Sequence, residues 1–243
     1  MGMVFGMLEA HPSMETFPPP EAATPEGLLA IGGDLSERRL MAAYRSGIFP
    51  WYGAGEPILW WSPDPRCVIF PARFKASRSL KKSLRRQAFR FTLDTAFERV
   101  IAECAAPRHA SRDGAGGTWI TAEMAQAYIG LHRSGVAHSA EIWQRDRLVG
   151  GLYGLALGGV FFGESMFSRE TDASKAALAL LIERLLKWDF RLIDCQIRSA
   201  HLLRLGAEEI PRSEFIARLQ SALALPGKPG NWSVGGPDHA GWS

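Results

Sequence analysis

One stretch in the second half of the 243-residue chain limits the possible folds more than any other. Residues 161–168 are a short aromatic run without proline, and residues 192–196 open with a second apolar run. Between them, residues 172–187 place apolar side chains on one broad face of a helix. This order predicts a strand, a helix and a strand. A connection of this length joins parallel strands through a right-handed crossover, so we expect a sheet with a parallel pair.

Three polar side chains lie in or at the end of these two strands. Asp194 and Gln196 are two residues apart, and strand side chains alternate, so both are expected on one face. Glu164 lies in the aromatic strand, where a carboxylate must be paired or functional. The structural alternatives are a capping or salt-bridged Asp194 and a Gln196 that bonds to loop backbone. Because open α/β sheets bind ligands where their strands end, these residues mark a candidate site.

The rest of the sequence divides at about residue 70. Residues 1–70 are rich in proline, glycine and aromatic side chains and predict a small N-terminal domain. Residues 71–243 predict the element order β-α-α-β-β-β-α-β-α. Three antiparallel strands followed by a crossover helix and one parallel strand resemble the N-acetyltransferase architecture. The predicted fold class is therefore α/β (α+β), with a GNAT-like C-terminal domain built on a mixed, mainly antiparallel sheet.

The sequence offers no motif for a cofactor or a metal. N-acetyltransferases usually hold coenzyme A on a glycine-containing loop, but the matching residues 167–175 contain no glycine. Backbone amides there could not approach a pyrophosphate as closely, which disfavours acetyl transfer from coenzyme A. The chain has no Walker loop, HExxH motif or nucleophile elbow, and His132 and His138 are too isolated to be metal ligands. We therefore expect neither a metal nor a cofactor.

Residues 71–90 hold eight basic residues and no acidic one, although the net charge of the whole chain is only +3. A helix that begins after Ser77 or Ser79 places several of these charges on one side. An ordinary solvated basic face is the alternative, but the lack of acidic partners favours contact with phosphates. The residues expected to contact nucleic acid are Arg78, Lys82, Arg85 and Arg86.

The segment before this helix is rich in tryptophan and proline. Trp60 and Trp61 either form a small aromatic core or contact a ligand. Trp51 follows a proline and precedes a glycine-rich turn, so we expect it to be exposed. Exposed aromatic side chains of this kind can stack on a base or on the terminal ribose of a nucleic acid.

Composition indicates a cytoplasmic protein. No apolar run reaches the roughly 18 residues that a membrane span requires. Residues 1–15 lack the basic and apolar regions of a secretory signal. The three cysteines are scattered singly, which suits a reducing compartment rather than a disulfide scaffold.

Nine motifs occur in one order over about residues 17–215: FPPPEAATPEGLLAIGGDL, GIFPWY, ILWWSPDPR, TWIT, GLYG, FFGESMFS, ASKAAL, LIDCQ and LGAEEIPR. Together they resemble the leucyl/phenylalanyl-tRNA–protein transferase family. The resemblance implies that Leu, Phe or Met moves from aminoacyl-tRNA to a protein whose N-terminal residue is Arg or Lys, which marks that protein for N-degron degradation. An aminoacyl ester is already activated, so this reaction requires no nucleotide and no metal.

The resemblance also implies roles for individual residues. Asp194 is expected to orient or deprotonate the attacking amine, and Gln196 to hold Asp194 or the tetrahedral intermediate. Glu164 is expected at the acceptor site, where an anion suits a cationic residue. The terminal adenosine is expected on Trp51, Trp119 and Tyr128. The matching positions for an apolar amino-acid pocket are Leu152, Phe161, Met166, Leu181, Leu185 and Ile193.

Two other functions stay open at this point. One is an acyltransferase that uses another donor, and the other is a non-catalytic module that binds tRNA or another RNA. Residues 107–118 form a polar, glycine-containing loop that is longer than the family resemblance predicts.

Overall fold

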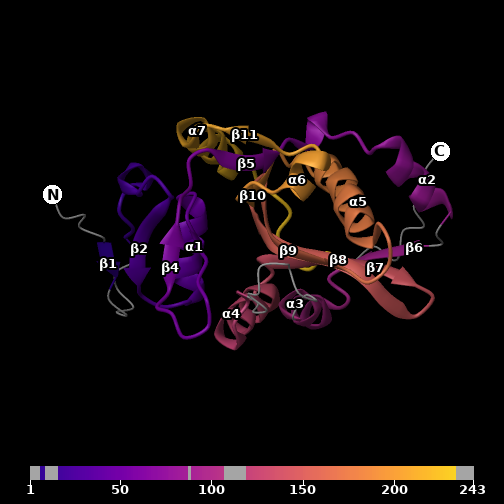
Figure 1. Ribbon diagram of the computed structural model, residues 1–243, viewed down its shortest axis with the longest axis horizontal. Coiled ribbons are helices and arrows are strands. Elements are labelled where there is room, and N and C mark those ends of the chain that lie inside the picture. Colours follow the sequence, from indigo (N-terminus) through magenta and orange to yellow (C-terminus); the bar gives the residue numbers. More distant parts are fainter. Residues whose placement is uncertain (1–5, 9–15, 87–88, 107–118, 234–243) are drawn as a thin grey trace.

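The computed structural model describes residues 6–8, 16–86, 89–106 and 119–233. The described chain forms two sheets, and the smaller lies at the end of the molecule opposite helix α2 (Figure 1). The smaller sheet has the strand order β1-β2-β4-β3. Its strands are β1 (Gly6–Leu8), β2 (Leu28–Gly32), β3 (Phe49–Pro50) and β4 (Leu59–Trp61), and helix α1 (Glu37–Arg45) connects β2 to β3.

The larger sheet has seven strands in the order β11-β5-β10-β9-β8-β7-β6. The strands are β5 (Arg66–Ile69), β6 (Phe89–Leu93), β7 (Ala137–Gln144), β8 (Arg147–Leu157), β9 (Val160–Ser168), β10 (Leu192–Gln196) and β11 (Glu208–Ile210). Strands β7, β8 and β9 are antiparallel neighbours, whereas β9 and β10 are parallel. The mixed, mainly antiparallel sheet and the strand–helix–strand crossover are confirmed.

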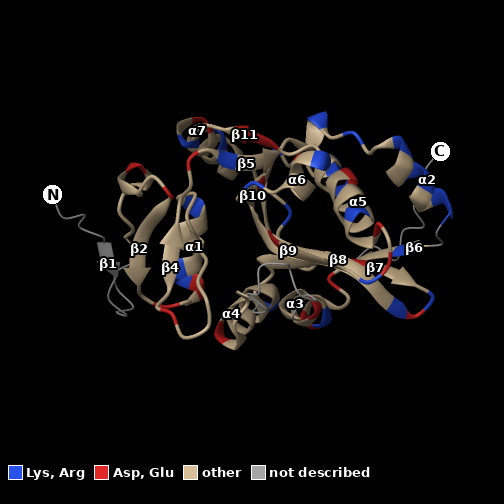
Figure 2. Cartoon of the chain, viewed as in Figure 1, with Lys and Arg blue, Asp and Glu red and all other residues tan. Residues whose placement is uncertain are grey.

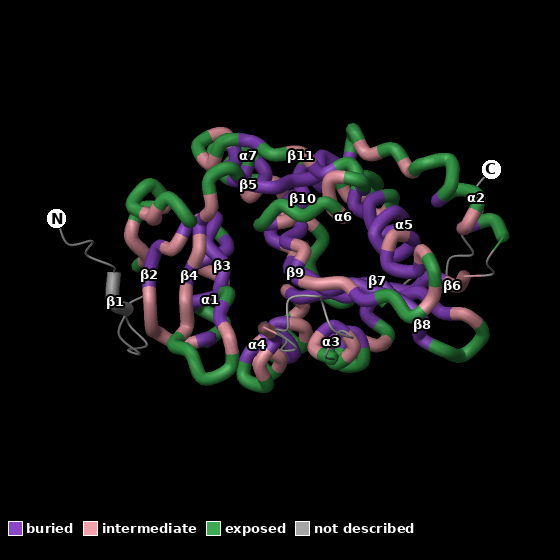
Figure 3. The backbone as a smooth tube through the Cα atoms, viewed as in Figure 1, coloured by how far each residue is buried: buried purple, intermediate pink, exposed green. Residues whose placement is uncertain are grey.

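Helices cover both faces of the larger sheet. They are α2 (Arg78–Arg86), α3 (Phe97–Ala105), α4 (Ala122–Arg133), α5 (Ala173–Lys187), α6 (Ala200–Arg204) and α7 (Arg212–Leu223), and two short 3-10 helices are Pro20–Ala22 and Pro71–Arg73. The crossover helix α5 lies on one face, and α3 and α4 lie on the other (Figure 1). Most of the sheet is buried, whereas α2 is largely exposed (Figure 3). Among the described residues, no helix combines the length and apolar character that a membrane span needs.

Local sequence signals account for several helix ends. Ser36 accepts a hydrogen bond from the backbone N–H of Arg39 at the start of α1, and Gly47 follows this helix with a φ of +75°. Ser77 accepts the N–H of Leu80 at the start of α2, and Thr121 caps α4 in the same way. The loop at residues 107–118 lies outside the described residues.

The expected division at residue 70 does not match the sheets. Strand β5 belongs to the larger sheet, between β10 and β11, so the chain passes from one sheet to the other within residues 62–65. Composition hides this change because prolines lie on both sides of β5. Moreover, the two sheets share one continuous core, in which Tyr44 and Trp60 from the first part join Tyr128 and Phe162 from the second. Trp60 is fully buried, so it is a core residue.

Candidate active site

The candidate site opens where β9 and β10 separate. Their parallel pairing runs from Leu192 opposite Val160 to Asp194 opposite Phe162. Beyond that point each strand carries a β-bulge: Glu164 is the extra residue of β9 against β8, and Cys195 is the extra residue of β10 against β5. The two strands therefore diverge, and the side chains that follow line a cavity of about 540 Å³.

The cavity walls come from widely separated segments. They are contributed by β3 and the loop after it, the segment before α4, strands β8, β9 and β10, helix α5, and the segment that leads into and begins α6. A glycine is required in β8 opposite the bulge of β9, since a Cβ atom on Gly154 would overlap the carbonyl oxygen of Phe162. The last glycine of the GLYG motif thus permits the close approach of β8 and β9.

Glu164 and Gln196 are a hydrogen-bonded polar pair in the cavity lining. Glu164 Oε1 accepts a hydrogen bond of 2.7 Å from Gln196 Nε2, and Glu164 Oε2 accepts one of 2.9 Å from the Tyr128 hydroxyl. The hydroxyl of Tyr44 on α1 hydrogen-bonds that of Tyr128, so the chain of contacts begins in the smaller sheet's helix. Burial raises the pKa of the Glu164 carboxyl to about 7, against the opposing effect of the hydrogen bonds from Tyr44 and Tyr128. This carboxyl therefore changes charge near neutral pH.

Asp194 lies behind this pair and is fully buried. Arg66 donates to both of its oxygens, from Nε at 2.8 Å and from Nη2 at 2.7 Å. Asp194 Oδ1 also accepts the backbone N–H of Gln196 at 2.9 Å. The Arg66 guanidinium lies between the rings of Phe49 and Phe215, at 4.8 and 4.5 Å from their centroids.

These contacts correct two expectations. Asp194 and Gln196 do not continue one strand face, because the bulge at Cys195 and the positive φ of Gln196, +62°, interrupt the alternation. Asp194 is also absent from the cavity lining, so its carboxylate is not placed to take a proton from a bound amine. The salt-bridged alternative is the one observed, and Asp194 also holds the backbone N–H of Gln196.

Two of the three aromatic residues expected to hold an adenosine do line the cavity. Trp51 is 41% exposed and Trp119 is half-buried, and both contribute to the cavity wall. The indole of Trp61 donates to the carbonyl oxygen of Trp51 at 2.7 Å, which fixes the backbone of that loop. Tyr128 is fully buried, its hydroxyl donates to Glu164, and it is absent from the cavity lining, so its expected contact with the adenosine stays a prediction. Helix α4 turns this side chain toward the sheet.

The apolar part of the cavity agrees with four of the six expected positions. Leu152, Phe161, Met166 and Ile193 line it. Leu181 and Leu185 do not, and both are buried in the core beneath α5. Leu178 lines the cavity in their place. The three leucines lie on one stripe of α5, but each residue advances about 1.5 Å along the axis, so only the N-terminal part of the stripe reaches the cavity.

Sequence reasoning missed several lining residues. Phe49, Tyr153 and Cys195 contribute side chains from β3, β8 and β10, and Arg198 and His201 contribute from the segment after Gln196. Tyr153 belongs to the GLYG motif, and its buried hydroxyl has no hydrogen-bond partner among the described residues. The segment after Gln196 could have been found from its position, because it directly follows the strand end that marks the site.

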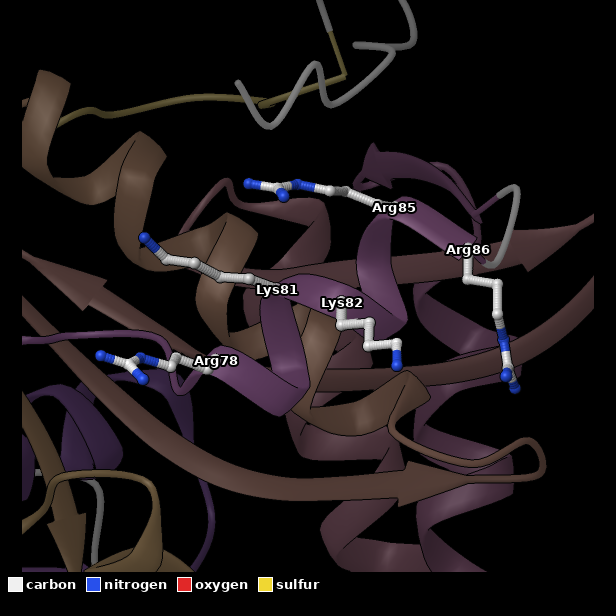
Figure 4. Close-up of a pocket in the computed structure, with 5 residues that line it drawn as sticks. All are labelled: Arg78, Lys81, Lys82, Arg85 and Arg86. Atoms are coloured by element: carbon white, nitrogen blue, oxygen red, sulfur yellow. The ribbon is translucent and has the colours of Figure 1, made fainter.

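The predicted basic helix is present and forms a separate surface. Arg78, Lys82, Arg85 and Arg86 on α2, together with Lys81, line a hollow of about 420 Å³. Figure 4 shows the side chains extending away from the helix, with Lys82 and Arg86 on one side and Lys81 and Arg85 on another. Leu80 and Leu84 anchor the opposite face in the core. Within the described chain, Arg78, Lys82, Arg85 and Arg86 have no ion pair with a carboxylate.

The site is thus a largely apolar cavity where parallel strands of a mixed sheet separate, with a buried carboxylate and an amide in its lining, and it is large enough to hold a small acyl group beside them. No cluster of three or more His, Cys, Asp or Glu side chains in the described ranges has a metal-binding arrangement. A family model described as leucyl/phenylalanyl-tRNA protein transferase matches residues 68–220, and the model of its N-terminal domain matches residues 33–64. The chain belongs to this family and is an aminoacyltransferase.

Curated relatives support the assignment over nearly the whole chain. Leucyl/phenylalanyl-tRNA–protein transferase of Anaeromyxobacter sp. (strain Fw109-5) is 55% identical over 228 residues, which are 94% of this chain and 96% of the relative. The proteins of the same name from Methylococcus capsulatus and Alkalilimnicola ehrlichii are 54% and 57% identical, each over 93% of this chain and over 95% and 87% of their own lengths.

Solved structures give a fainter likeness. L-PGS from Bacillus licheniformis is 10% identical, covers 71% of this chain and 54% of its own, and has a TM-score of 0.39. A GCN5-related N-acetyltransferase from Kribbella flavida is 11% identical, covers 71% of this chain and 59% of its own, and has a TM-score of 0.36. The family assignment rests on the family models and the sequence relatives.

Proposed function

We propose that the protein transfers leucine, phenylalanine or methionine from aminoacyl-tRNA to the N-terminal Arg or Lys of an acceptor protein. A peptide bond forms, and the new N-terminal residue marks the acceptor for N-degron degradation. The observation that carries this proposal is the Glu164–Gln196 pair in the lining of a largely apolar cavity that Trp51 and Trp119 also line. Family membership supplies the donor and acceptor classes.

The cavity accounts for the range of donors. The apolar side chains of Leu152, Phe161, Met166, Leu178 and Ile193 surround the space for an uncharged side chain. Such a pocket distinguishes similar apolar side chains by only ~1–3 kcal/mol per methylene, so several amino acids are accepted. In this proposal Trp51 and Trp119 hold the terminal adenosine, to which the amino acid is esterified.

Alignment supplies most of the rate in this proposal. The α-amine of the acceptor has an unperturbed pKa near 7.7–8.0, so a useful fraction is neutral at cellular pH. Holding that amine against the activated ester can contribute ~7–11 kcal/mol. The amine nitrogen bonds to the carbonyl carbon and the ester C–O bond breaks. The proton lost by the amine ends on the ribose hydroxyl of the released tRNA.

In this proposal Glu164 binds the side chain of the acceptor, and Gln196 orients its amine. The ionised Glu164 carboxylate attracts the cationic side chain of the acceptor. Because Gln196 Nε2 donates to Glu164, the Gln196 amide is held with its oxygen free to accept a hydrogen bond from the amine. Asp194 positions Gln196 by accepting the backbone N–H of Gln196, and Arg66 positions Asp194 through its side-chain hydrogen bonds.

The rest of the donor and its setting complete the proposal. The basic side chains of α2 contact tRNA phosphates away from the reaction centre, so they contribute affinity. We place the reaction in the cytoplasm, because Cys67, Cys104 and Cys195 are free thiols and free thiols persist in a reducing compartment.

One assay tests this function against the alternatives. Radiolabelled Leu-tRNA and Phe-tRNA are mixed with a protein that has N-terminal Arg, and with the same protein after N-terminal acetylation as a control. We expect label in the unblocked acceptor alone. Binding of tRNA without transfer favours a non-catalytic RNA-binding module, and turnover of an acyl-coenzyme A favours an acyltransferase with another donor. Either result contradicts the proposal.

A further inference from the structure

A second hollow of about 330 Å³ lies beside the active-site cavity. Its walls come from residues 74–80, which lead into α2, from the start of α5, and from α6. His201 lines both this hollow and the active-site cavity. The hollow therefore borders the cavity at His201, on the side where residues 74–80 lead into α2.

The lining of this hollow is positively charged. It includes Lys75, Lys175 and Arg204, and its carboxylate is Asp172. Lys175 pairs with Asp172 at 2.7 Å. Lys75 and Arg204 have no carboxylate partner in the part of the chain that the structure describes. Two cations thus remain for a ligand, and Figure 2 shows basic residues along α2, α5 and α6.

Neutral hydrogen-bonding groups accompany these cations. The hydroxyls of Ser77 and Ser79 lie 3.0 Å apart in the wall at the start of α2. Burial and the cations Lys175 and Arg204 lower the pKa of His201, so its ring is neutral at pH 7. A neutral imidazole can both donate and accept a hydrogen bond. Hydroxyls, a neutral ring and two unpaired cations match the oxygens of a sugar–phosphate backbone.

We propose that this hollow binds the phosphodiester backbone just upstream of the terminal adenosine of aminoacyl-tRNA. This inference rests on the proposed function, because the strand direction follows from an adenosine placed in the active-site cavity. The hollow then joins the reaction centre to the basic face of α2. Lys75 and Arg204 contact the first phosphates, and the α2 side chains contact phosphates further from the ester.

Because these contacts follow one another along the donor, the proposal can be tested with donors that contain different numbers of nucleotides. His201 borders the cavity, Lys75 and Arg204 come next, and Arg78 begins α2. Arg86 is eight residues further along the helix, which is about 12 Å along its axis. A short donor therefore reaches the hollow without reaching the end of α2.

Three donors and three variants form the experiment. The donors are an aminoacyl-adenosine, an aminoacylated CCA trinucleotide and the full aminoacyl-tRNA. The variants are the hollow pair Lys75→Gln/Arg204→Gln, the helix pair Lys82→Gln/Arg85→Gln, and the control Arg45→Gln on the exposed side of α1. We expect the hollow pair to lower kcat/KM for the trinucleotide and for the tRNA by at least about tenfold more than it lowers kcat/KM for aminoacyl-adenosine, since each lost contact is to a charged group. The helix pair should affect the tRNA alone.

Two results overturn the proposal. One is a kcat/KM for the aminoacylated trinucleotide that is the same in the hollow-pair variant as in the control Arg45→Gln. The other is a loss of kcat/KM for aminoacyl-adenosine as large as the loss for the trinucleotide, in a hollow-pair variant whose unfolding temperature equals that of the parent. In that case the two residues act on the cavity itself and not on the upstream phosphates. Arg204→Lys should retain more trinucleotide activity than Arg204→Gln. Direct binding of unacylated CCA trinucleotide tests the hollow even if transfer fails, so a failure of the proposed function is distinguishable from a failure of this site.

Discussion

The buried pair of Arg66 and Asp194 gives the most discriminating test of how the site is built. Both side chains are fully buried, and they are joined by two hydrogen bonds of 2.7 and 2.8 Å. Asp194→Asn removes one charge and leaves the Arg66 guanidinium uncompensated inside the core. Breaking a buried pair in this way costs about 3–5 kcal/mol, which is a large share of a typical folding stability of ~5–15 kcal/mol. Arg66→Met should cost a similar amount.

The double variant Arg66→Met/Asp194→Asn should behave differently. It removes both charges, and methionine can occupy the space between the rings of Phe49 and Phe215. Replacing a buried ion pair with groups of similar shape is often neutral, so we expect recovery to within about 2 kcal/mol of the parent. The asparagine introduced by Asp194→Asn keeps a side-chain oxygen that can accept the Gln196 backbone N–H.

The assay is a double-mutant cycle with two readouts. Urea unfolding gives the stability of the parent, the two single variants and the double variant, and transfer is then measured at saturating donor and acceptor under conditions where each is folded. We expect the double variant to transfer within about tenfold of the parent. A loss of ~10²–10⁴-fold in a stably folded double variant is the size of a lost general base. That result would refute the positioning role and return Asp194 to the proton transfer.

Three further predictions concern the donor and the acceptor. Changing Lys82, Arg85 and Arg86 together to Ala should raise KM for aminoacyl-tRNA and flatten its salt dependence, and an unchanged salt slope would show that the tRNA lies elsewhere. Trp51→Ala and Trp119→Ala should each weaken binding of an aminoacyl-adenosine analogue by roughly 1–3 kcal/mol, measured by titration, and parental affinity in folded variants would make both residues structural. The Glu164 carboxyl has its pKa raised to about 7, so it gains its charge as pH rises through 7 and acceptor affinity should increase over that range. In Glu164→Gln this pH dependence should disappear and KM should rise most for N-terminal Arg and Lys acceptors, whereas an identical pH profile would remove Glu164 from acceptor binding.

The raised pKa of Glu164 also makes the stability of the folded state depend on pH. Because the folded carboxyl binds its proton up to about pH 7 and the unfolded one only to about 4.5, the contribution of Glu164 to stability decreases as pH rises between these values. Function therefore requires a charge that the fold itself disfavours.

Local patterns in the sequence were sufficient for much of the fold. The apolar face of α5, the caps at Ser36 and Thr121, and the crossover from β9 to β10 depend on residues close together in the chain, and all are observed. The boundary between the sheets was misplaced because β5 continues the proline-rich composition of the first part.

The site was harder to predict because its geometry depends on distant partners. Arg66 and Asp194 are 128 residues apart, and no local pattern indicates that they pair. The bulge at Cys195 breaks the two-residue alternation that placed Asp194 and Gln196 on one face. Similarly, periodicity identified the apolar stripe of α5, but it could not show that only Leu178 reaches the cavity.

Mass spectrometry of the acceptor tests the central claim most directly. The parent protein is incubated with Leu-tRNA or Phe-tRNA and with matched acceptors that differ only in having N-terminal Arg, Lys or Ala. We predict one added leucine or phenylalanine at the N-terminus of the Arg and Lys acceptors and none on the Ala acceptor. Unmodified Arg and Lys acceptors in the presence of intact aminoacyl-tRNA and folded protein would contradict the account, as would equal modification of all three.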